Sequence, residues 1–204
     1  MEQAYLYVVL SSTPYKMGRF IRRFTGEFYN HSSIALDAGL TRMYSFARRY
    51  YRTPFYGGFI RESLSRYHIN GQSADIKVCR IPVSPEQYDQ LHAQLKSMYA
   101  NKEHYLYNHL SALSTPFKKL IKVKDAYICT QFVAQMLRLA GMDTDPEQYY
   151  SVGDIEKLVE SYAIYTGPAP QGEYDESFYA RNPVPHPVWT SVRNILALFP
   201  RMGK

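Results

Sequence analysis

Apolar and polar positions alternate in several short segments, which predicts strands. Residues 5–11 are rich in β-forming side chains, and Thr13-Pro14 ends the run. In residues 31–37, every second side chain points the same way, so His31 and the small Ser33 and Ala35 share a face that would let a helix approach closely. Three further strands are expected at residues 41–48, 74–81 and 162–166.

Helical periodicity and capping residues predict the helices. Ser84-Pro85 is a typical helix start, and the helix is expected to run to about residue 100. An apolar stripe recurs from Phe132 to Ala140 and stops at Gly141. Other helices are expected at residues 16–25, which are basic, 151–161 and 189–199. In the last of these, the aligned apolar side chains favour packing on the domain over binding to lipid.

Two segments interrupt this pattern. Residues 49–70 contain Thr53-Pro54 and Gly57-Gly58, which indicates an insertion or lid with a short helix near residues 59–66. A proline-rich tail begins at about residue 168 and is expected to be mostly extended. No internal repeat is visible, so residues 1–204 are expected to form one α+β domain with a small antiparallel sheet.

Composition narrows the function classes. Hydrophobic residues make up 46% of the chain, which favours a globular protein over a disordered one. The net charge of +6 is scattered, so solvated faces are favoured, although a membrane surface or an acidic substrate stays open. No nucleic-acid-binding signature is present. The histidines have no metal-ligand spacing, and we expect no metal or other cofactor.

The chain has two cysteines, too few for a disulfide framework. We expect no signal peptide, because Glu2 precedes a short apolar run without a basic region. No stretch reaches the roughly 20 apolar residues that span a bilayer. A reducing cytoplasm is therefore the expected location, and it would keep both thiols free. Cys79 lies inside a predicted strand and is interpreted as structural.

Cys129 lies where an irregular, lysine-rich segment changes into the apolar helix. A thiol in the first turn of a helix feels the positive end of the helix dipole, so its pKa falls. His31, at the start of a predicted strand, is a candidate general base for it. A lone cysteine on an apolar helix face is usually inert packing, so the two interpretations differ on whether His31 and Cys129 meet in space.

The order of these residues resembles the circularly permuted branch of the NlpC/P60 papain-like superfamily, which includes YiiX-like and lecithin-retinol-acyltransferase-like proteins. Tyr-Asn-His-Ser-Ser-Ile-Ala-Leu-Asp at 29–37 is similar to the family's histidine strand. Tyr-Ile-Cys-Thr-Gln-Phe-Val at 127–133 is similar to its cysteine helix, and the segment starting at Ser151 is similar to the family's next helix and strand. The resemblance covers roughly residues 1–48 and 120–167.

This resemblance implies a papain-like fold with Cys129 as nucleophile and His31 as general base. The family's third residue sits on the next strand, where Ser45 is the polar side chain in the matching position. A strong carboxylate or amide is lacking there. Tyr127 and the backbone N–H of Cys129 are candidate oxyanion donors.

The implied function is cysteine-dependent hydrolysis or acyl transfer at an amide or ester carbonyl. Peptides, cell-wall fragments and lipids are all possible substrates. The alternative is a non-catalytic binding module on the same scaffold, for an amphipathic or anionic ligand, and the lack of a strong third residue supports it.

Overall fold

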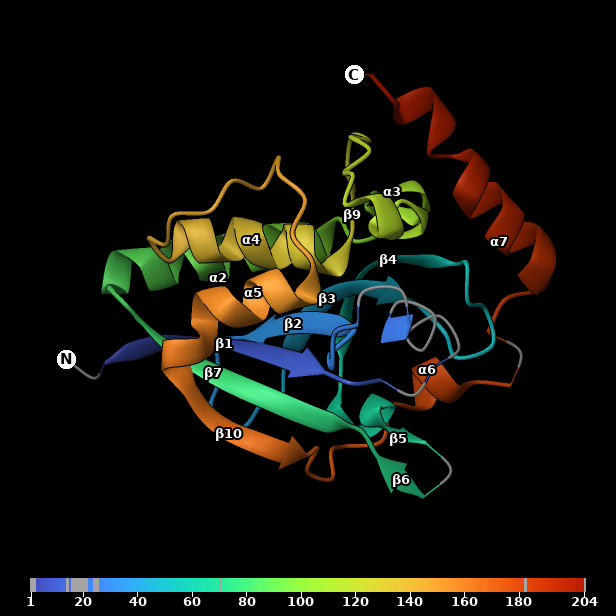
Figure 1. Cartoon of the computed structure of the whole chain (residues 1–204). Coiled ribbons are helices and arrows are strands. Elements are labelled where there is room, and N and C mark those ends of the chain that lie inside the picture. Colours follow the sequence, from blue (N-terminus) through green and yellow to red (C-terminus); the bar gives the residue numbers. More distant parts are fainter. Residues whose placement is uncertain are drawn as a thin grey trace.

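The fold is α+β, built on a six-stranded antiparallel sheet. The computed structural model describes residues 3–13, 15, 22–23, 26–69, 71–181 and 183–203. The strand order is β10-β7-β1-β2-β3-β4, and each neighbouring pair is antiparallel (Figure 1). The strands are β1 (Ala4–Ser11), β2 (His31–Ala35), β3 (Met43–Arg48), β4 (Gly57–Glu62), β7 (Asp75–Val83) and β10 (Ala163–Pro168). Most of the helix expected at 16–25 lies outside the described residues.

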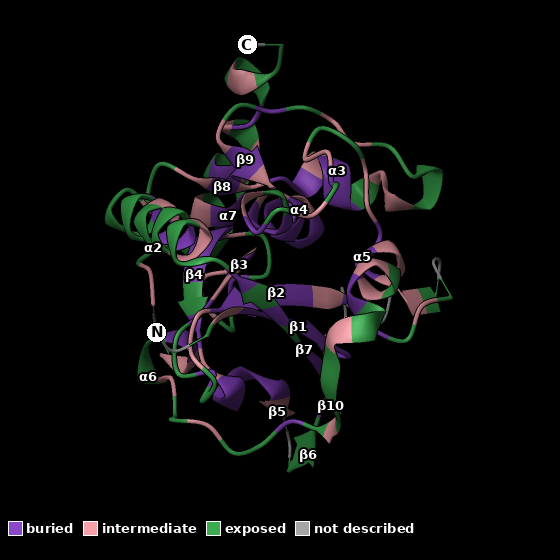
Figure 2. Ribbon diagram, turned by 90° about the vertical axis from the view of Figure 1, so that its left-hand side faces the viewer, coloured by how far each residue is buried: buried purple, intermediate pink, exposed green. Residues whose placement is uncertain are grey.

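Three helices cover one face of this sheet. They are α2 (Pro85–Ala100), α4 (Cys129–Leu139) and α5 (Val152–Val159). Phe132, Val133 and Met136 of α4 lie fully buried against sheet residues such as Leu6 and Ile34. Figure 2 shows α4 as a buried helix, whereas α2 exposes its outer side. The main hydrophobic core therefore lies between the sheet and α4.

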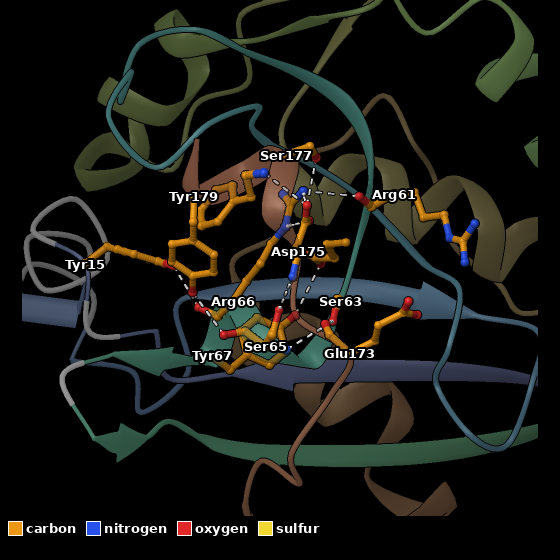
Figure 3. A network of polar contacts seen from close by, with 12 residues as sticks. Tyr15, Arg61, Ser63, Ser65, Arg66, Tyr67, Glu173, Asp175, Ser177 and Tyr179 are labelled. Atoms are coloured by element: carbon orange, nitrogen blue, oxygen red, sulfur yellow. Dashed lines mark hydrogen bonds and ion pairs between the residues drawn. The ribbon is translucent and has the colours of Figure 1, made fainter. Parts of the chain in front are cut away.

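The opposite face of the sheet has a smaller core, formed with the 3₁₀ helix η1 (Leu64–Tyr67). A short hairpin of β5 (His68–Ile69) and β6 (Gln72–Ser73) follows it. The C-terminal tail crosses this side and forms α6 (Glu176–Tyr179). Arg66 of η1 pairs with Asp175 at 2.6 Å, at the centre of a polar network that ties the tail to η1 (Figure 3).

The remaining elements pack beside the end of the sheet where β4 begins. Strands β8 (Leu106–Tyr107) and β9 (Ala126–Tyr127) are parallel. Helix α3 (His109–Leu113) and the 3₁₀ helix η2 (Thr115–Phe117) lie between them in sequence, and α7 (Pro187–Leu196) follows the tail. The 3₁₀ helix η4 (Phe199–Arg201) follows α7, whereas the 3₁₀ helix η3 (Glu160–Tyr162) lies away from this end of the sheet, beside β7 and α5. A third apolar cluster, which includes Leu106, Val123, Ala126 and Leu198, joins the residues that follow α7 to β8 and β9.

Most predicted elements form where local sequence signals place them. The helix after Ser84 shows why: the Ser84 hydroxyl accepts from the Gln87 N–H, and the Gln87 side chain accepts from the Ser84 N–H. The helix expected near residues 59–66 is confirmed only at its end, as η1, because residues 57–62 are strand β4, paired along its length with β3. This segment is thus the edge strand of the central sheet.

Within the described residues, every helix is too short or too polar to cross a bilayer.

Candidate active site

Cys129 is the first residue of α4. Ile128 caps the helix in an extended conformation and makes no side-chain capping hydrogen bond to the N–H groups of the first turn. These N–H groups make the helix start a region of positive potential. The Cys129 side chain is almost fully buried and borders a small pocket, so a reactive thiol here faces a protein-walled space.

His31, the first residue of β2, lies beside this thiol. The two side chains are close enough to shift each other's pKa, and Nε2 of His31 lies 3.0 Å from Oε1 of Glu62. Because Nε2 bonds the carboxylate, Nδ1 is the ring nitrogen that remains for the sulfur. Residues on β2 and α4 that are far apart in the chain are brought together, and Glu62 joins them from β4.

An opening in the sheet explains how these side chains meet. Ile34 and Leu10 face α4, whereas Ser11, the cross-strand partner of His31, faces the opposite side with Tyr67. Strand β2 pairs with β3 only at Ile34–Tyr44 and Ala35–Met43 among the described residues. The ladder is therefore absent beside His31, and the thiol and the imidazole can meet from opposite faces at this end of β2. The helix expected on the small-residue face of His31 instead packs on the other face.

Glu62 is a buried carboxylate with two hydrogen-bonding neighbours. The Tyr67 hydroxyl donates to Oε1 of Glu62 at 3.2 Å, and His31 shares the same oxygen. Burial alone would raise the pKa of Glu62, but the positive His31, its hydrogen bond, and the nearby Arg66 and Ser45 lower it. Glu62 is therefore ionised at neutral pH despite being buried.

The pKa values of His31 and Cys129 shift in opposite directions. Burial alone would lower the pKa of His31, but the negative charge of Glu62 and the hydrogen bonds to Cys129 and Glu62 raise it to about 10. Burial would likewise raise the pKa of Cys129, but the hydrogen bond and charge of His31, together with contacts to Ser32, lower it. The pair is set up as thiolate and imidazolium.

The pocket beside the sulfur is narrow and lined by aromatic and polar side chains. Its volume is about 30 Å³, which is room for a water molecule. Its walls include Tyr107 of β8, Tyr149 and the start of α5 at Val152. Burial, then the negative charge of Cys129, raises the pKa of Tyr107 well above its usual range. The Tyr107 phenol thus keeps its proton close to the thiolate.

The two other residues expected in the site have different surroundings. Ser45 is fully buried on β3, where its proximity helps to lower the pKa of Glu62, although its hydroxyl lacks a hydrogen-bond partner among the described residues. The Tyr127 ring packs against Phe46 and Tyr105, with centroid distances of 5.1 and 6.4 Å, outside the pocket lining beside Cys129. Tyr107, the register partner of Tyr127, lines the pocket instead, together with Tyr149 and Tyr150.

Sequence reasoning missed Glu62 and Tyr107 because Gly57-Gly58 was interpreted as a break. These glycines instead allow β8 to approach β4. A Cβ on Gly57 would lie 2.7 Å from the Tyr107 Cβ, and a Cβ on Gly58 would meet the Tyr105 carbonyl. The β-forming pair Phe59-Ile60 next to these glycines was the available signal for a strand, but a predicted strand alone does not show that Glu62 is buried.

No protein-family model, curated protein or solved structure matches this chain.

Proposed function

We propose that the protein is a cysteine-dependent hydrolase or acyltransferase that acts on an amide or ester carbonyl. The contact chain from Cys129 through His31 to Glu62 carries this proposal. It combines a thiol of lowered pKa, a base within hydrogen-bond reach and a carboxylate that fixes the base. If the His31–Glu62 pair had only a structural role, it would not need the Cys129 thiol beside it at the edge of a pocket.

The first half of the reaction forms a thioester. The Cys129 thiolate attacks the carbonyl carbon, and the carbonyl π electrons move to oxygen. The N–H groups at the start of α4 and the protonated Tyr107 phenol, which borders the same pocket, stabilise that oxyanion. As the oxyanion collapses, the C–N or C–O bond breaks, and the His31 imidazolium gives its proton to the leaving amine or alcohol.

The second half regenerates the enzyme. Neutral His31 takes a proton from water, or from an acceptor alcohol or amine, as that molecule attacks the thioester. The C–S bond then breaks and Cys129 leaves as the thiolate, again paired with the imidazolium. Water gives hydrolysis and another nucleophile gives transfer. Glu62 stays ionised throughout and holds Nε2 of His31, so it acts as a positioning residue.

We also propose that the α+β fold is papain-like, of the permuted NlpC/P60 type. Its support is the chain order, with histidine on a strand before cysteine at a helix start, and the packing of α4 on an antiparallel sheet. The acidic residue comes from the second strand after the histidine strand, because β3 lies between β2 and β4.

The test measures alkylation of the thiols by iodoacetamide as a function of pH. We expect Cys129 to react with an apparent pKa well below about 8.5, the value of a free cysteine. Glu62→Gln removes the charge that holds the imidazolium, so the pKa of His31 falls and the pKa of Cys129 rises. The alkylation rate at pH 6 should then fall roughly tenfold or more.

Matched controls separate this effect from general damage. Cys79→Ala should leave the fast reaction unchanged, because burial raises the pKa of Cys79 to about 12. Glu156→Gln removes a carboxylate that binds Lys77 at 2.6 Å, and it should also have no effect. Cys129→Ala should abolish the reaction. A Cys129 thiol that stays inert below pH 9 would instead favour the non-catalytic binding module.

A further inference from the structure

Helix α7 has its polar and apolar sides reversed relative to a helix that packs on a core. Its inward residues Ser191 and Asn194 are buried, whereas Val188 and Trp189 are 79% and 62% exposed. The same outward side also carries Val192, Leu196 and, in η4, Phe199. Beyond the last turn of α7, Leu198 joins the third apolar cluster. A surface helix normally buries its apolar side instead.

Polar contacts hold α7 in this orientation. The Asn194 side chain accepts from the Gly57 N–H at 3.3 Å. Beyond the helix, the Lys124 N–H donates to the Arg201 carbonyl, and the Arg201 guanidinium donates to the His104 carbonyl. Figure 1 shows α7 along one side of the molecule, beyond α3 and β4. The apolar face is therefore held outward by specific bonds.

The chain segment that carries this face is basic. Residues 177–204 contain three arginines and one lysine and no acidic residue. Arg193 is exposed on the helix itself. The neighbouring α3–η2 segment adds exposed Leu113 and Phe117, followed by Lys118 and Lys119. An apolar face with an exposed tryptophan, on a basic segment beside two further lysines, is complementary to an anionic lipid surface.

We infer that the outward face of α7, formed by Val188, Trp189, Val192 and Leu196, docks the protein on anionic membranes. The helix lies in the interface, with its apolar side chains among the lipids and the arginines at the phosphate groups. This docking does not require the chemistry at Cys129. The α3–η2 segment lies next to both sites, because its Ala112 and Thr115 line the pocket beside Cys129.

Trp189 makes the test direct, because it is the single tryptophan of the chain. With vesicles of phosphatidylcholine and phosphatidylglycerol, its emission should shift to the blue and be quenched by brominated acyl chains. Phosphatidylcholine alone should bind less protein, and about 0.5 M NaCl should weaken binding to the anionic vesicles. Cys129→Ala should bind as tightly as the wild type.

Two substitutions keep the reporter and place a charge on the face. Val188→Glu and Leu196→Glu should each lower the partition coefficient about tenfold or more. Ile164→Glu is the matched control: Ile164 is 52% exposed on β10, and its replacement should leave binding unchanged. Circular dichroism checks that each variant is folded.

Two outcomes would overturn the inference. One is the absence of any emission shift or quenching with anionic vesicles. The other is an emission shift that depends on protein concentration without lipid and accompanies a dimer in light scattering, because a second copy would then cover the face.

Discussion

Burial acts against both charges at the site, and single neighbours reverse its effect. His31 would favour the neutral imidazole if desolvation were the only influence, and Cys129 would favour the neutral thiol. The Glu62 carboxylate, 3.0 Å from Nε2, changes the balance for His31, and the charged His31 then changes it for Cys129. The chemistry at this site therefore depends on one carboxylate that bonds the imidazole on the side away from the sulfur.

A prediction about a single residue concerns Tyr107. Tyr107→Phe should slow acylation of Cys129 by a p-nitrophenyl ester about a hundredfold, because it removes one donor to the oxyanion. Alkylation by iodoacetamide forms no oxyanion, so its rate should hardly change. Release of nitrophenolate in the first turnover and the rate of alkylation are the two measurements.

Tyr127→Phe is the control for this prediction, since Tyr127 pairs with Tyr107 in register but packs on Phe46. It should leave both rates unchanged. If Tyr127→Phe slowed acylation and Tyr107→Phe did not, the donor expected from the sequence would be the correct one.

Among the elements, β4 contributes most to the site. It places Glu62 on the sheet face that carries Met43 and Tyr67, and its first residues support β8 and α7. The glycines at its start leave room for the Tyr107 side chain to pass. A strand that looked like a loop insertion thus connects the carboxylate, the pocket wall and the C-terminal helix.

Gly57→Ala tests this close approach. The new methyl group would lie 2.7 Å from the Tyr107 Cβ and 2.9 Å from the Ala47 carbonyl oxygen. Because both neighbours belong to packed backbone or the base of a side chain, we expect a loss of about 1–3 kcal/mol in the free energy of unfolding. Urea denaturation followed by circular dichroism measures it.

Gly39→Ala is the matched control. Its nearest atom would be the Thr41 Cγ2 at 3.3 Å, the end of a side chain at an exposed turn. Its free energy of unfolding should change by less than about 1 kcal/mol in either direction. Equal losses for the two variants would contradict the close packing of β4 against β8.

At the scale of the whole molecule, the C-terminal tail stabilises η1, the 3₁₀ helix beside Glu62. Arg66 donates to Asp175 and lies 4.2 Å from the centre of the Phe178 ring, while the Tyr179 hydroxyl donates to the Ser65 carbonyl (Figure 3). These contacts hold η1, which also carries Tyr67, the partner of Glu62. The tail is therefore a structural part of the domain.

Asp175→Asn should lower the free energy of unfolding by about 3 kcal/mol, because it removes the carboxylate that pairs directly with the buried Arg66. Burial would raise the pKa of Asp175, but Arg66 and hydrogen bonds lower it. A carboxylate whose folded pKa is lowered stabilises the protein above the unfolded pKa, and this contribution is lost as the pH falls through the folded one. The difference from wild type should thus shrink below about pH 4.

Urea denaturation at several pH values measures this dependence. The control is Glu147→Gln, which breaks the exposed Lys122–Glu147 pair and should cost less than about 1 kcal/mol. A loss for Asp175→Asn that stayed constant down to pH 3 would contradict an ionic origin.

The sequence by itself determined the elements that depend on neighbours along the chain. Capping at Ser84, the apolar stripe ending at Gly141 and the alternation after His31 are local signals, so the cysteine at a helix start and the histidine at a strand start could be predicted. Their meeting remained an expectation, because it depends on how α4 packs over the opening between β2 and β3.

Only the tertiary structure decided which side chains complete the site. Glu62 became the partner of His31 through pairing of β3 with β4, and Tyr107 reached the pocket through the approach of β8 to the glycines. It likewise turned the apolar side of α7 outward, through the bond from Gly57 to Asn194. The physical reason is the same in each case: the ionisation of a buried group and the exposure of an apolar face depend on contacts with groups that are distant in the chain.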